Sequence, residues 1–304
     1  MPIPADAAVP DPSTDVVRSL LARHLPEWRV RSVVPLGAGL DNAAFDVDGE
    51  LVVRCSTHPD PGVRSRRVLR EARLLATVAA RSPLPVPVPR FTAADDGCLA
   101  YTRLSGRPLL DVPVAQRSRL AAVVGAELGG LLTALAALPT ELMTDLAGID
   151  DTRSGEWLDE CRDLLPRLAP AIPDRHLPAV EAFLGADPPS PAGQLVFTHG
   201  DLGIEHVLVD PDTGRVTGIL DWGDAAVTDP AHDLGLILRD LGPQALDAAL
   251  AAYGVLPDGV PALRRRIGFS ARCALLEDLA HGLDTGRDVY VEKSLLGMAG
   301  LFPA

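Results

Sequence analysis

The sequence predicts an α+β fold in two lobes, a small strand-rich lobe followed by a larger and mainly helical one. Short β-branched runs separated by glycine turns fill residues 28–104, and a single long helical pattern interrupts them. From residue 114 onward, apolar residues recur at helical spacing. Between these regions lies Ser105-Gly106-Arg107-Pro108, a natural hinge because glycine and proline interrupt regular structure. At 304 residues the chain has ample core for two lobes.

The first lobe is expected at residues 15–103, after a mobile N-terminus rich in proline and aspartate at residues 1–14. Ser13 or Thr14 can cap a helix that runs from Asp15 to His24. The other elements expected in this lobe are strands at 28–36, 44–47, 50–54, 91–93 and 99–104, and a helix at 63–80. The Asp48-Gly49 turn joins two of these strands.

The second lobe is expected to cover residues 104–304. Its predicted helices lie at 116–138, 154–168, 178–184, 230–240, 243–253, 259–281 and 287–297. The stretch 120–138 is apolar enough to suggest a membrane span. Its central Glu127 and three glycines favour a buried helix of a globular lobe instead.

Composition narrows the class of partner. The formal net charge of −13 argues against nucleic acid or an anionic membrane as the main partner. It suits a cationic or neutral small substrate, and it also suits solubility alone. The four cysteines form no CxxC pair and the N-terminus has no secretion signal, so we expect a reduced cytoplasmic chain with buried thiols.

The most informative stretch is 196–224, where three short apolar runs end in polar residues. Asp201 follows the first run, and Asp221 follows the third, with His206 between them. The second and third runs flank a Pro-Asp-x-Gly turn, which predicts a hairpin. Carboxylates on loops held by a rigid hairpin can bind metal ions and orient a nucleophile. A hydrolase metal site of His199, Asp201 and His206 is the less favoured interpretation.

The first lobe carries a second candidate arrangement. Gly37 and Gly39 lie in a turn whose backbone N–H groups could bind phosphates. Arg54 ends an apolar strand, and Glu71 lies on the helix that follows. A cation on a strand, held by a helix carboxylate, is how kinases orient the residue that grips nucleotide phosphates. The alternative is an ordinary surface ion pair.

Four segments together resemble the aminoglycoside phosphotransferase family. They are His199-Gly200-Asp201-Leu202, Val207-Leu208-Val209-Asp210, the run from Gly218 to Asp224 that contains Asp-Trp-Gly, and the run from Asp229 to Leu234. The resemblance spans residues 33–283 and is most specific in the second lobe. It implies a bilobal protein-kinase-like fold that transfers phosphate to hydroxyls of antibiotics or small metabolites.

The resemblance also implies roles in the second lobe. Asp201 would be the catalytic base, Asp221 the principal Mg²⁺ ligand, and Asp233 a brace for the catalytic loop. His206 stands where the family usually has a Mg²⁺-binding asparagine. The segment from Gly203 to Leu208 resembles the Gly-His variant of macrolide phosphotransferases, in which histidine also occurs. Because Mg²⁺ prefers oxygen ligands, this histidine could weaken one metal position. Glu277, Asp278 and Asp284 would bind substrate, the alternative being a solvated helix face.

On the nucleotide side, Arg54 would grip the phosphates of ATP or GTP and Glu71 would orient it. The backbone of Tyr101, Thr102 and Arg103 would contact the base. The family usually has lysine where Arg54 stands, and arginine reaches phosphates differently. Lys293 is the only lysine in the chain, so it could supply that role only if the C-terminal region folds back.

The expected activity is therefore Mg²⁺-dependent transfer of the γ-phosphate of ATP or GTP to a hydroxyl of a small molecule. A macrolide or an aminoglycoside-like antibiotic is the leading substrate. A metabolic kinase of a sugar, amino alcohol or amino acid is the first alternative. A nucleotide-binding pseudokinase is the second, and His206 and Arg54 are the features that favour it.

Overall fold

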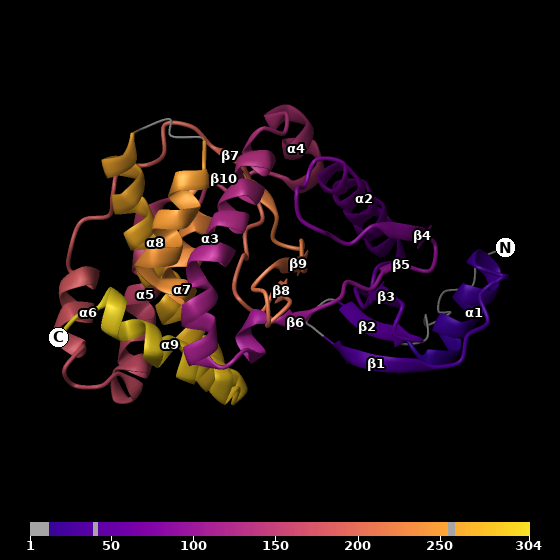
Figure 1. The fold of residues 1–304 in the computed structure, drawn as a ribbon, viewed down its shortest axis with the longest axis horizontal. Helices are drawn as coiled ribbons and strands as arrows, with labels where there is room; N and C mark the ends of the chain where they lie inside the picture. The colour runs from indigo at the N-terminus through magenta and orange to yellow at the C-terminus, as the bar shows by residue number, and fades with distance from the viewer. Residues whose placement is uncertain (1–11, 39–41, 255–258) are drawn as a thin grey trace, which may run out of the picture. The chain divides into compact units, whose positions relative to one another are not determined.

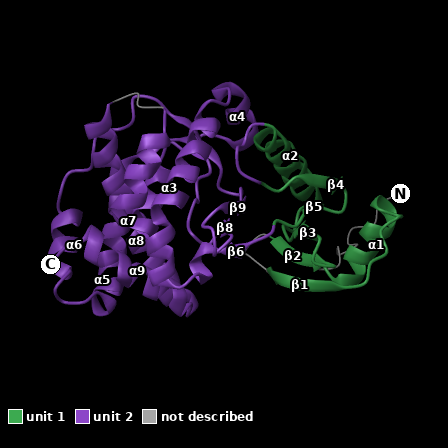
Figure 2. Cartoon of the chain, in the orientation of Figure 1, with its two compact units in different colours: residues 1–80, 86–104 green, residues 81–85, 105–304 purple. Residues whose placement is uncertain are grey.

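The computed structural model describes residues 12–38, 42–254 and 259–304. The chain divides into two compact units, residues 1–80 with 86–104, and residues 81–85 with 105–304 (Figure 2). Unit 1 is built on one antiparallel sheet, whereas unit 2 is mainly helical with two small sheets (Figure 1). This architecture is the α+β organisation that the sequence predicts.

Unit 1 contains a five-stranded sheet in the order β1-β2-β3-β5-β4. Its elements are α1 (Thr14–His24), β1 (Val33–Ala38), β2 (Asn42–Val47), β3 (Leu51–Ser56), α2 (Pro61–Ala79), β4 (Pro89–Ala93) and β5 (Cys98–Thr102). The α1 cap is as predicted, because Ser13 Oγ accepts a hydrogen bond from the Val16 N–H at 3.3 Å. Asp48 and Gly49, at φ 58° and 75°, form the tight turn between β2 and β3.

The core of unit 1 lies between α1 and the sheet. Val17, Leu20 and Leu21 of α1 are buried in one hydrophobic cluster with side chains of β2 and β3, including Phe45 and Val53. Each fully buried side chain of this kind stabilises the fold by roughly 1.5–3 kcal/mol relative to exposure. The packing fixes β3, the strand that carries Arg54.

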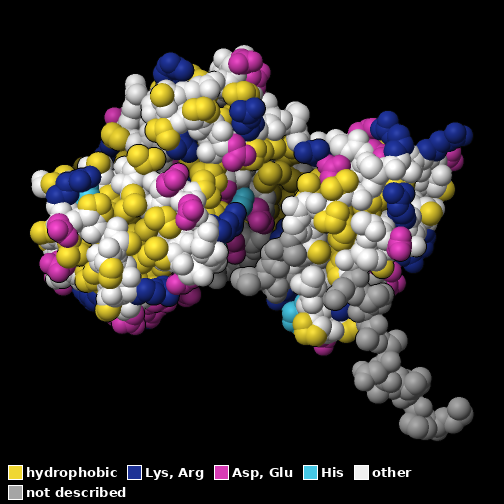
Figure 3. Space-filling view, turned by 90° about the horizontal axis from the view of Figure 1, so that it is seen from below, with side chains coloured by type: hydrophobic (Ala, Val, Ile, Leu, Met, Phe, Trp, Pro, Cys, Tyr) yellow, Lys and Arg dark blue, Asp and Glu magenta, His cyan; other side chains and the backbone are white. Residues whose placement is uncertain are grey.

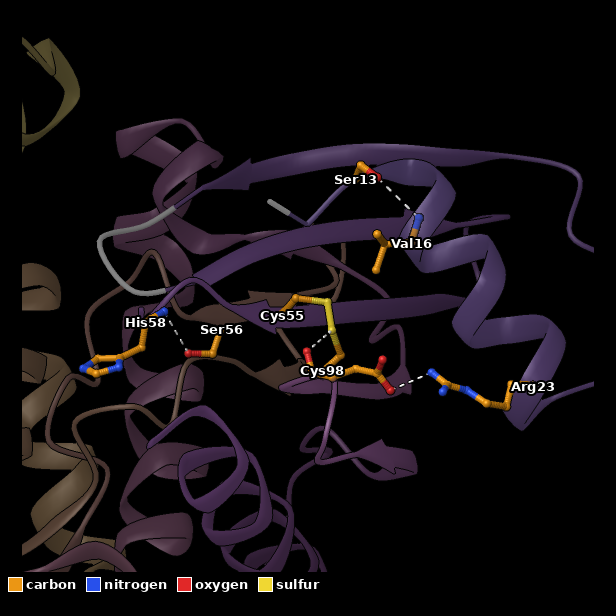
Figure 4. Close-up of a disulfide and its surroundings, with 8 residues drawn as sticks. Ser13, Val16, Arg23, Cys55, Ser56, His58 and Cys98 are labelled. Atoms are coloured by element: carbon orange, nitrogen blue, oxygen red, sulfur yellow. Dashed lines mark hydrogen bonds and ion pairs between the residues drawn. A yellow bond between two sulfur atoms is a disulfide. The ribbon is translucent and has the colours of Figure 1, made fainter. Parts of the chain in front are cut away.

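The cysteines of unit 1 correct an expectation. Cys55 and Cys98 form a disulfide between β3 and β5 (Figure 4), although the sequence predicts reduced thiols. The two residues are direct partners in the antiparallel register, and cysteines on directly opposite positions come within bonding reach. A separation of 43 residues gives no sign of this pairing in the sequence. Cys161 and Cys273 are free and buried, as expected.

Unit 2 consists of helices with short strands on one side. Its elements are β6 (Arg107–Pro108), a 3₁₀ turn (Leu109–Asp111), α3 (Val114–Ala136), α4 (Thr140–Ala147), α5 (Ser154–Leu168), a second 3₁₀ turn (Ala169–Ala171), α6 (Leu177–Leu184), β7 (Val196–Thr198), β8 (Val207–Val209), β9 (Val216–Ile219), β10 (Ala226–Thr228), α7 (Ala231–Ala252), α8 (Val260–Thr285) and α9 (Asp288–Leu301). Neither α4 nor β10 was predicted from the sequence. α7 is kinked at Gly242, where φ is 79°, which explains why two helices were expected there.

Helix α3 of unit 2 lies against α7 (Figure 1). By length and composition alone it is the one helix among the described residues that could cross a membrane. Its packing is that of a core helix, because a Cβ at Gly125 or Gly129 would collide with the α7 backbone at Ala245 or Ala249. Its central Glu127 accepts a hydrogen bond from the Val216 N–H of β9 at 2.6 Å. The charge therefore anchors the β8–β9 hairpin.

The surface of unit 2 carries both signs of charge. In the view of Figure 3, acidic and basic side chains are interspersed with hydrophobic ones on this face. The net charge of −13 is therefore not gathered into one patch there.

Candidate active site

The loop between β7 and β8, residues 199–206, is held by hydrogen bonds to the first turn of α7. The fully buried Asp233 accepts hydrogen bonds from the N–H groups of His199 at 2.7 Å and of Gly200 at 3.1 Å. Gly200 has φ +83°, and a Cβ there would collide with the Asp224 carbonyl. Only glycine fits this position without strain. The predicted bracing role of Asp233 is confirmed.

The neutral side chain of His199 links the loop of residues 199–206 to Leu220, which follows β9. Its Nδ1 accepts a hydrogen bond from the Asp201 N–H at 3.2 Å, so Nε2 carries the proton and donates to the Leu220 carbonyl at 2.8 Å. Burial lowers the pKa of His199 and keeps the ring uncharged. The ring packs edge-on against Trp222, with centroids 4.6 Å apart. His199 therefore holds the loop by hydrogen bonds.

Asp201 and His206 form an ion pair, with His206 Nε2 3.0 Å from Asp201 Oδ2. Burial raises the pKa of Asp201, but the hydrogen bond and the charge of His206 outweigh it and bring the pKa to about 2. Burial lowers the pKa of His206, and the Asp201 carboxylate outweighs that effect and raises it. The Asp201 side chain is 40% exposed. An ionised carboxylate is thus presented to solvent from a rigid loop.

Asp221 lies in a strained backbone conformation at the end of β9. Its φ is +54°, and among the described non-glycine residues only Asp48, in a tight turn, shares a positive φ. Strain of this kind is concentrated at functional sites. Burial, followed by the charges of Asp201 and Asp221, raises the pKa of the nearby Asp224. Asp224 is therefore close enough to Asp201 and Asp221 to be repelled by both.

This excess of carboxylate suits a divalent cation. In the part of the chain that the structure describes, no three His, Cys, Asp or Glu side chains are grouped so that they could hold a metal ion. Mg²⁺ commonly binds one or two protein carboxylates and keeps waters and substrate phosphates as its other ligands. Asp221 fits such a partial donor set. The second predicted ligand, His206, is hydrogen-bonded to Asp201 instead.

A buried charge network behind the loop was not predicted. The Lys293 ammonium of α9 lies 3.1 Å from both Glu205 carboxylate oxygens and 2.8 Å from Asp278. Asp240 of α7 accepts two 2.8 Å hydrogen bonds from Arg239 and one of 3.2 Å from the Ile204 N–H. The network holds the loop next to His206. Lys293 is thus occupied inside unit 2 and does not take a phosphate-binding place.

The predicted nucleotide residues lie in unit 1. Arg54 and Glu71 are brought together, with Arg54 Nη1 2.9 Å from Glu71 Oε1 and both side chains about one fifth exposed. Tyr101 and Thr102 pair with β3 in the sheet, and the Arg103 N–H donates to the Glu50 carbonyl at 2.9 Å. Gly37 is exposed in β1, at φ +155°. Gly39 lies outside the described residues.

A cavity of about 680 Å³ in unit 2 is lined in part by Glu277. Trp157 Nε1 donates to Glu277 Oε1 at 2.7 Å, and the Trp157 ring stacks on His232 with centroids 5.3 Å apart. His232 directly precedes Asp233, the brace of the catalytic loop. We name this space the acceptor cavity. Sequence reasoning missed Trp157 and His232, although His232 lies inside a segment that carried the family resemblance.

The other two predicted substrate residues lie elsewhere. Asp278 faces the buried network, 2.9 Å from Arg239. Asp284 is half exposed and paired with Arg167 at 2.9 Å. The structure therefore places Glu277 on the acceptor cavity and separates it from Asp278 and Asp284.

These features define a kinase-like phosphotransferase fold with a carboxylate-bearing catalytic loop. The chain belongs to the phosphotransferase enzyme family (APH), whose model matches residues 32–267. It is 30% identical to viomycin phosphotransferase of Streptomyces vinaceus over 182 residues, which is 59% of this chain and 63% of that relative's length.

Solved structures agree with this assignment. A macrolide 2'-phosphotransferase from Brachybacterium faecium superposes with a TM-score of 0.61 and 28% identity, over 95% of this chain and 99% of its own. The GDP complex of an aminoglycoside 2'-phosphotransferase-IIIa gives a TM-score of 0.67 at 21% identity, over 93% and 96%. The second likeness shows the fold alone. The ternary complex of APH(2")-IIa with streptomycin and ATP also has this fold, with a TM-score of 0.58 at 15% identity over 97% of this chain and 96% of its own.

Proposed function

We propose that this protein transfers the γ-phosphate of ATP or GTP to a hydroxyl of a small, amine-bearing antibiotic, in the cytoplasm. The observation that carries the proposal is the rigid loop that presents the ionised Asp201 beside Asp221 and Asp224. Phosphoryl transfer needs held phosphates, neutralised charge and an oriented hydroxyl, and little covalent chemistry from the protein. The loop supplies the orienting carboxylate.

Each residue has a definite task in this proposal. Asp201 Oδ1 or Oδ2 accepts a hydrogen bond from the acceptor hydroxyl and takes its proton as the phosphate is transferred. Asp221 would hold Mg²⁺, which would supply positive charge to neutralise the nucleotide phosphates. Arg54, oriented by Glu71, would bind nucleotide phosphates. His206 orients the Asp201 carboxylate through its Nε2.

The acceptor cavity supports a cationic substrate. Its volume of about 680 Å³ falls within the roughly 300–1,000 Å³ of typical small-molecule sites. Its lining includes five carboxylates and two guanidiniums, those of Asp150, Asp151, Glu160, Asp229, Glu277, Arg153 and Arg266. Burial raises the pKa of Glu277, so a ligand ammonium beside it would favour its charged form. The indole of Trp157 offers an aromatic face in the same wall.

The start of α7 both lines the acceptor cavity and holds the catalytic loop. Asp229 and His232 line the cavity, and Asp233 in the same turn holds the backbone of His199 and Gly200. A substrate in the cavity is therefore one helical turn from the element that fixes Asp201. The names of viomycin, macrolide and aminoglycoside phosphotransferases among the relatives are consistent with an amine-bearing antibiotic.

The test combines nucleotide binding, turnover and an antibiotic panel. Sensitive bacteria that express the chain should survive at least one peptide, macrolide or aminoglycoside antibiotic, and the purified protein should phosphorylate that compound. Asp201→Asn should remove turnover and leave MgATP or MgGTP binding intact, because Asp201 contacts the acceptor and not the nucleotide. Full activity of that variant would refute the assignment. Nucleotide binding without turnover on any acceptor would favour a pseudokinase, and turnover on metabolites alone would favour a metabolic kinase.

A further inference from the structure

A second cavity lies in unit 2, and none of its lining residues lines the acceptor cavity. It has a volume of about 260 Å³ and lies between the start of α3, the kink of α7 and the end of α9. We name it the α3–α9 cavity. Its volume is just below the roughly 300–1,000 Å³ of typical small-molecule sites, so it suits a compound smaller than a nucleotide.

Most of its wall is apolar. Leu238 and Leu241 of α7 and Leu301 of α9 line it, together with Val114 and Leu296 at its rim. Val114 is 48% exposed and Leu296 58% exposed, which makes them two of the more exposed large hydrophobic residues of the protein. A short alkyl chain placed against these side chains would remove apolar surface from water, which is worth about 25 cal/mol per Å².

One cation in the wall has hydrogen-bonding capacity to spare. A guanidinium has five N–H donors, and within the described ranges Arg117 uses one of them in a single long hydrogen bond, 3.5 Å to the Leu110 carbonyl. Burial lowers the pKa of Arg117, and Asp240 is the one carboxylate that counteracts this effect. By contrast, Arg239 and Lys293 in the same wall make short ion pairs with carboxylates. Arg117 is therefore the group that an incoming anion would meet.

We propose that the α3–α9 cavity binds a short aliphatic carboxylate, with its carboxylate on Arg117 and its chain against Leu238, Leu241 and Leu296. A guanidinium binds a carboxylate through two parallel N–H···O bonds, which a hydroxyl of the same size cannot reproduce. The acid terminus and the alkyl chain are both needed for recognition.

The cavity is connected to the catalytic loop by hydrogen bonds on two sides of Ile204. Arg117 donates to the Leu110 carbonyl, and the Leu110 N–H donates to the Ile204 carbonyl at 3.1 Å. The Ile204 N–H in turn donates to Asp240, another residue of the cavity wall, at 3.2 Å. A carboxylate bound by two N–H groups of Arg117 draws the guanidinium away from the Leu110 carbonyl, which removes a contact that supports the Leu110–Ile204 attachment. On the basis of the proposed function, occupancy lowers kcat and leaves the KM for nucleotide unchanged.

The binding test needs no knowledge of the reaction. Acetate, butanoate, hexanoate and octanoate, with 1-hexanol as the uncharged match, are titrated into the full chain by calorimetry at neutral pH. Affinity should rise from acetate to hexanoate, and 1-hexanol and the Arg117→Gln variant should each bind about tenfold more weakly, a loss of about 1.4 kcal/mol. Leu296→Trp, which fills the rim, should abolish binding. Arg119→Gln on the exposed side of the same helix is the matched control and should bind like the native protein.

Three results would overturn the site: no saturable binding of any acid, equal affinity for hexanoate and 1-hexanol, or equal affinity in the native protein and Arg117→Gln. The coupling to the loop is tested separately, by the kcat for an acceptor found in the antibiotic panel with and without saturating hexanoate. An unchanged kcat at full occupancy would refute the coupling. If no acceptor is turned over, the proposed function fails while the calorimetry still decides the site.

Discussion

Replacing Lys293 by methionine tests the buried network that holds the catalytic loop. The Lys293 side chain is 5% exposed and its Nζ lies within 3.1 Å of Glu205 and Asp278. Methionine keeps much of the volume and removes the charge, which leaves Glu205, 12% exposed, without this partner. Removing one partner of a buried ion pair costs about 3–5 kcal/mol. For a unit of about 200 residues, at roughly 2–4 °C per kcal/mol, Tm should fall by about 6–20 °C.

The fall in the Tm of Lys293→Met should depend on pH. Without the ammonium, the buried Asp278, whose pKa burial already raises, loses a charge that lowers it, so its folded-state pKa rises further above the unfolded one. A carboxylate whose pKa is raised on folding destabilises the protein increasingly as pH rises through its unfolded pKa. The Tm deficit of Lys293→Met should therefore be larger at about pH 8 than at about pH 5.

Thermal and urea unfolding of matched variants measure this effect. Arg264→Met is the control, because Arg264 pairs with Asp247 at 2.6 Å but the two side chains are 45% and 63% exposed. A surface pair contributes about 0–1 kcal/mol despite its shorter distance. The double variant Lys293→Met with Glu205→Gln should recover part of the loss. If the Tm deficit of Lys293→Met is no larger than that of Arg264→Met, or does not change with pH, the buried network does not hold the loop in place.

Three further predictions follow from the same structure. Gly125→Ala should destabilise the protein by about 1–3 kcal/mol because its Cβ meets the α7 backbone, whereas Gly130→Ala in the same helix meets open space and should stabilise it by about 0.5–1 kcal/mol; urea unfolding decides. Asp233→Asn replaces a two-bond carboxylate acceptor by an amide and should lower kcat by about 100-fold with nucleotide affinity unchanged, and an unaltered kcat would contradict the bracing role. Glu277→Gln should raise the acceptor KM without changing that of the nucleotide, while Asp284→Asn, outside the cavity, should leave both alone.

The sequence was most informative where the deciding interactions are local. The α1 cap involves Ser13 and Val16, three residues apart, and the β2–β3 turn needs only Asp48 and Gly49 to adopt positive φ. The family motifs likewise placed Asp201 and Asp221 on the two loops that flank one hairpin. Interactions of this kind join residues that are close in the sequence, so the sequence alone can predict them.

Contacts between distant segments could not be read in the same way. The Cys55–Cys98 disulfide depends on the register of β3 against β5, and the Trp157–Glu277 hydrogen bond joins residues 120 positions apart. Helix geometry alone could have separated Glu277 from Asp278, since neighbouring helical residues point about 100° apart. That rule predicts that Glu277 and Asp278 lie on different faces of α8. It does not predict that Glu277 lines a cavity while Asp278 contacts Lys293.

The ion pair with His206 affects how Asp201 could serve as the proposed catalytic base. Bonded to His206, Asp201 has a pKa of about 2, which makes it a weak proton acceptor by the usual match between catalytic pKa and working pH. In a loose phosphoryl-transfer transition state the hydroxyl gives up its proton late, and alignment of the attacking oxygen contributes more than basicity. The low pKa also keeps Asp201 ionised at every pH above its own value, so the carboxylate always accepts the hydroxyl hydrogen bond. In the proposed reaction the Asp201–His206 pair would therefore orient the acceptor, and the histidine would act through the position of the carboxylate.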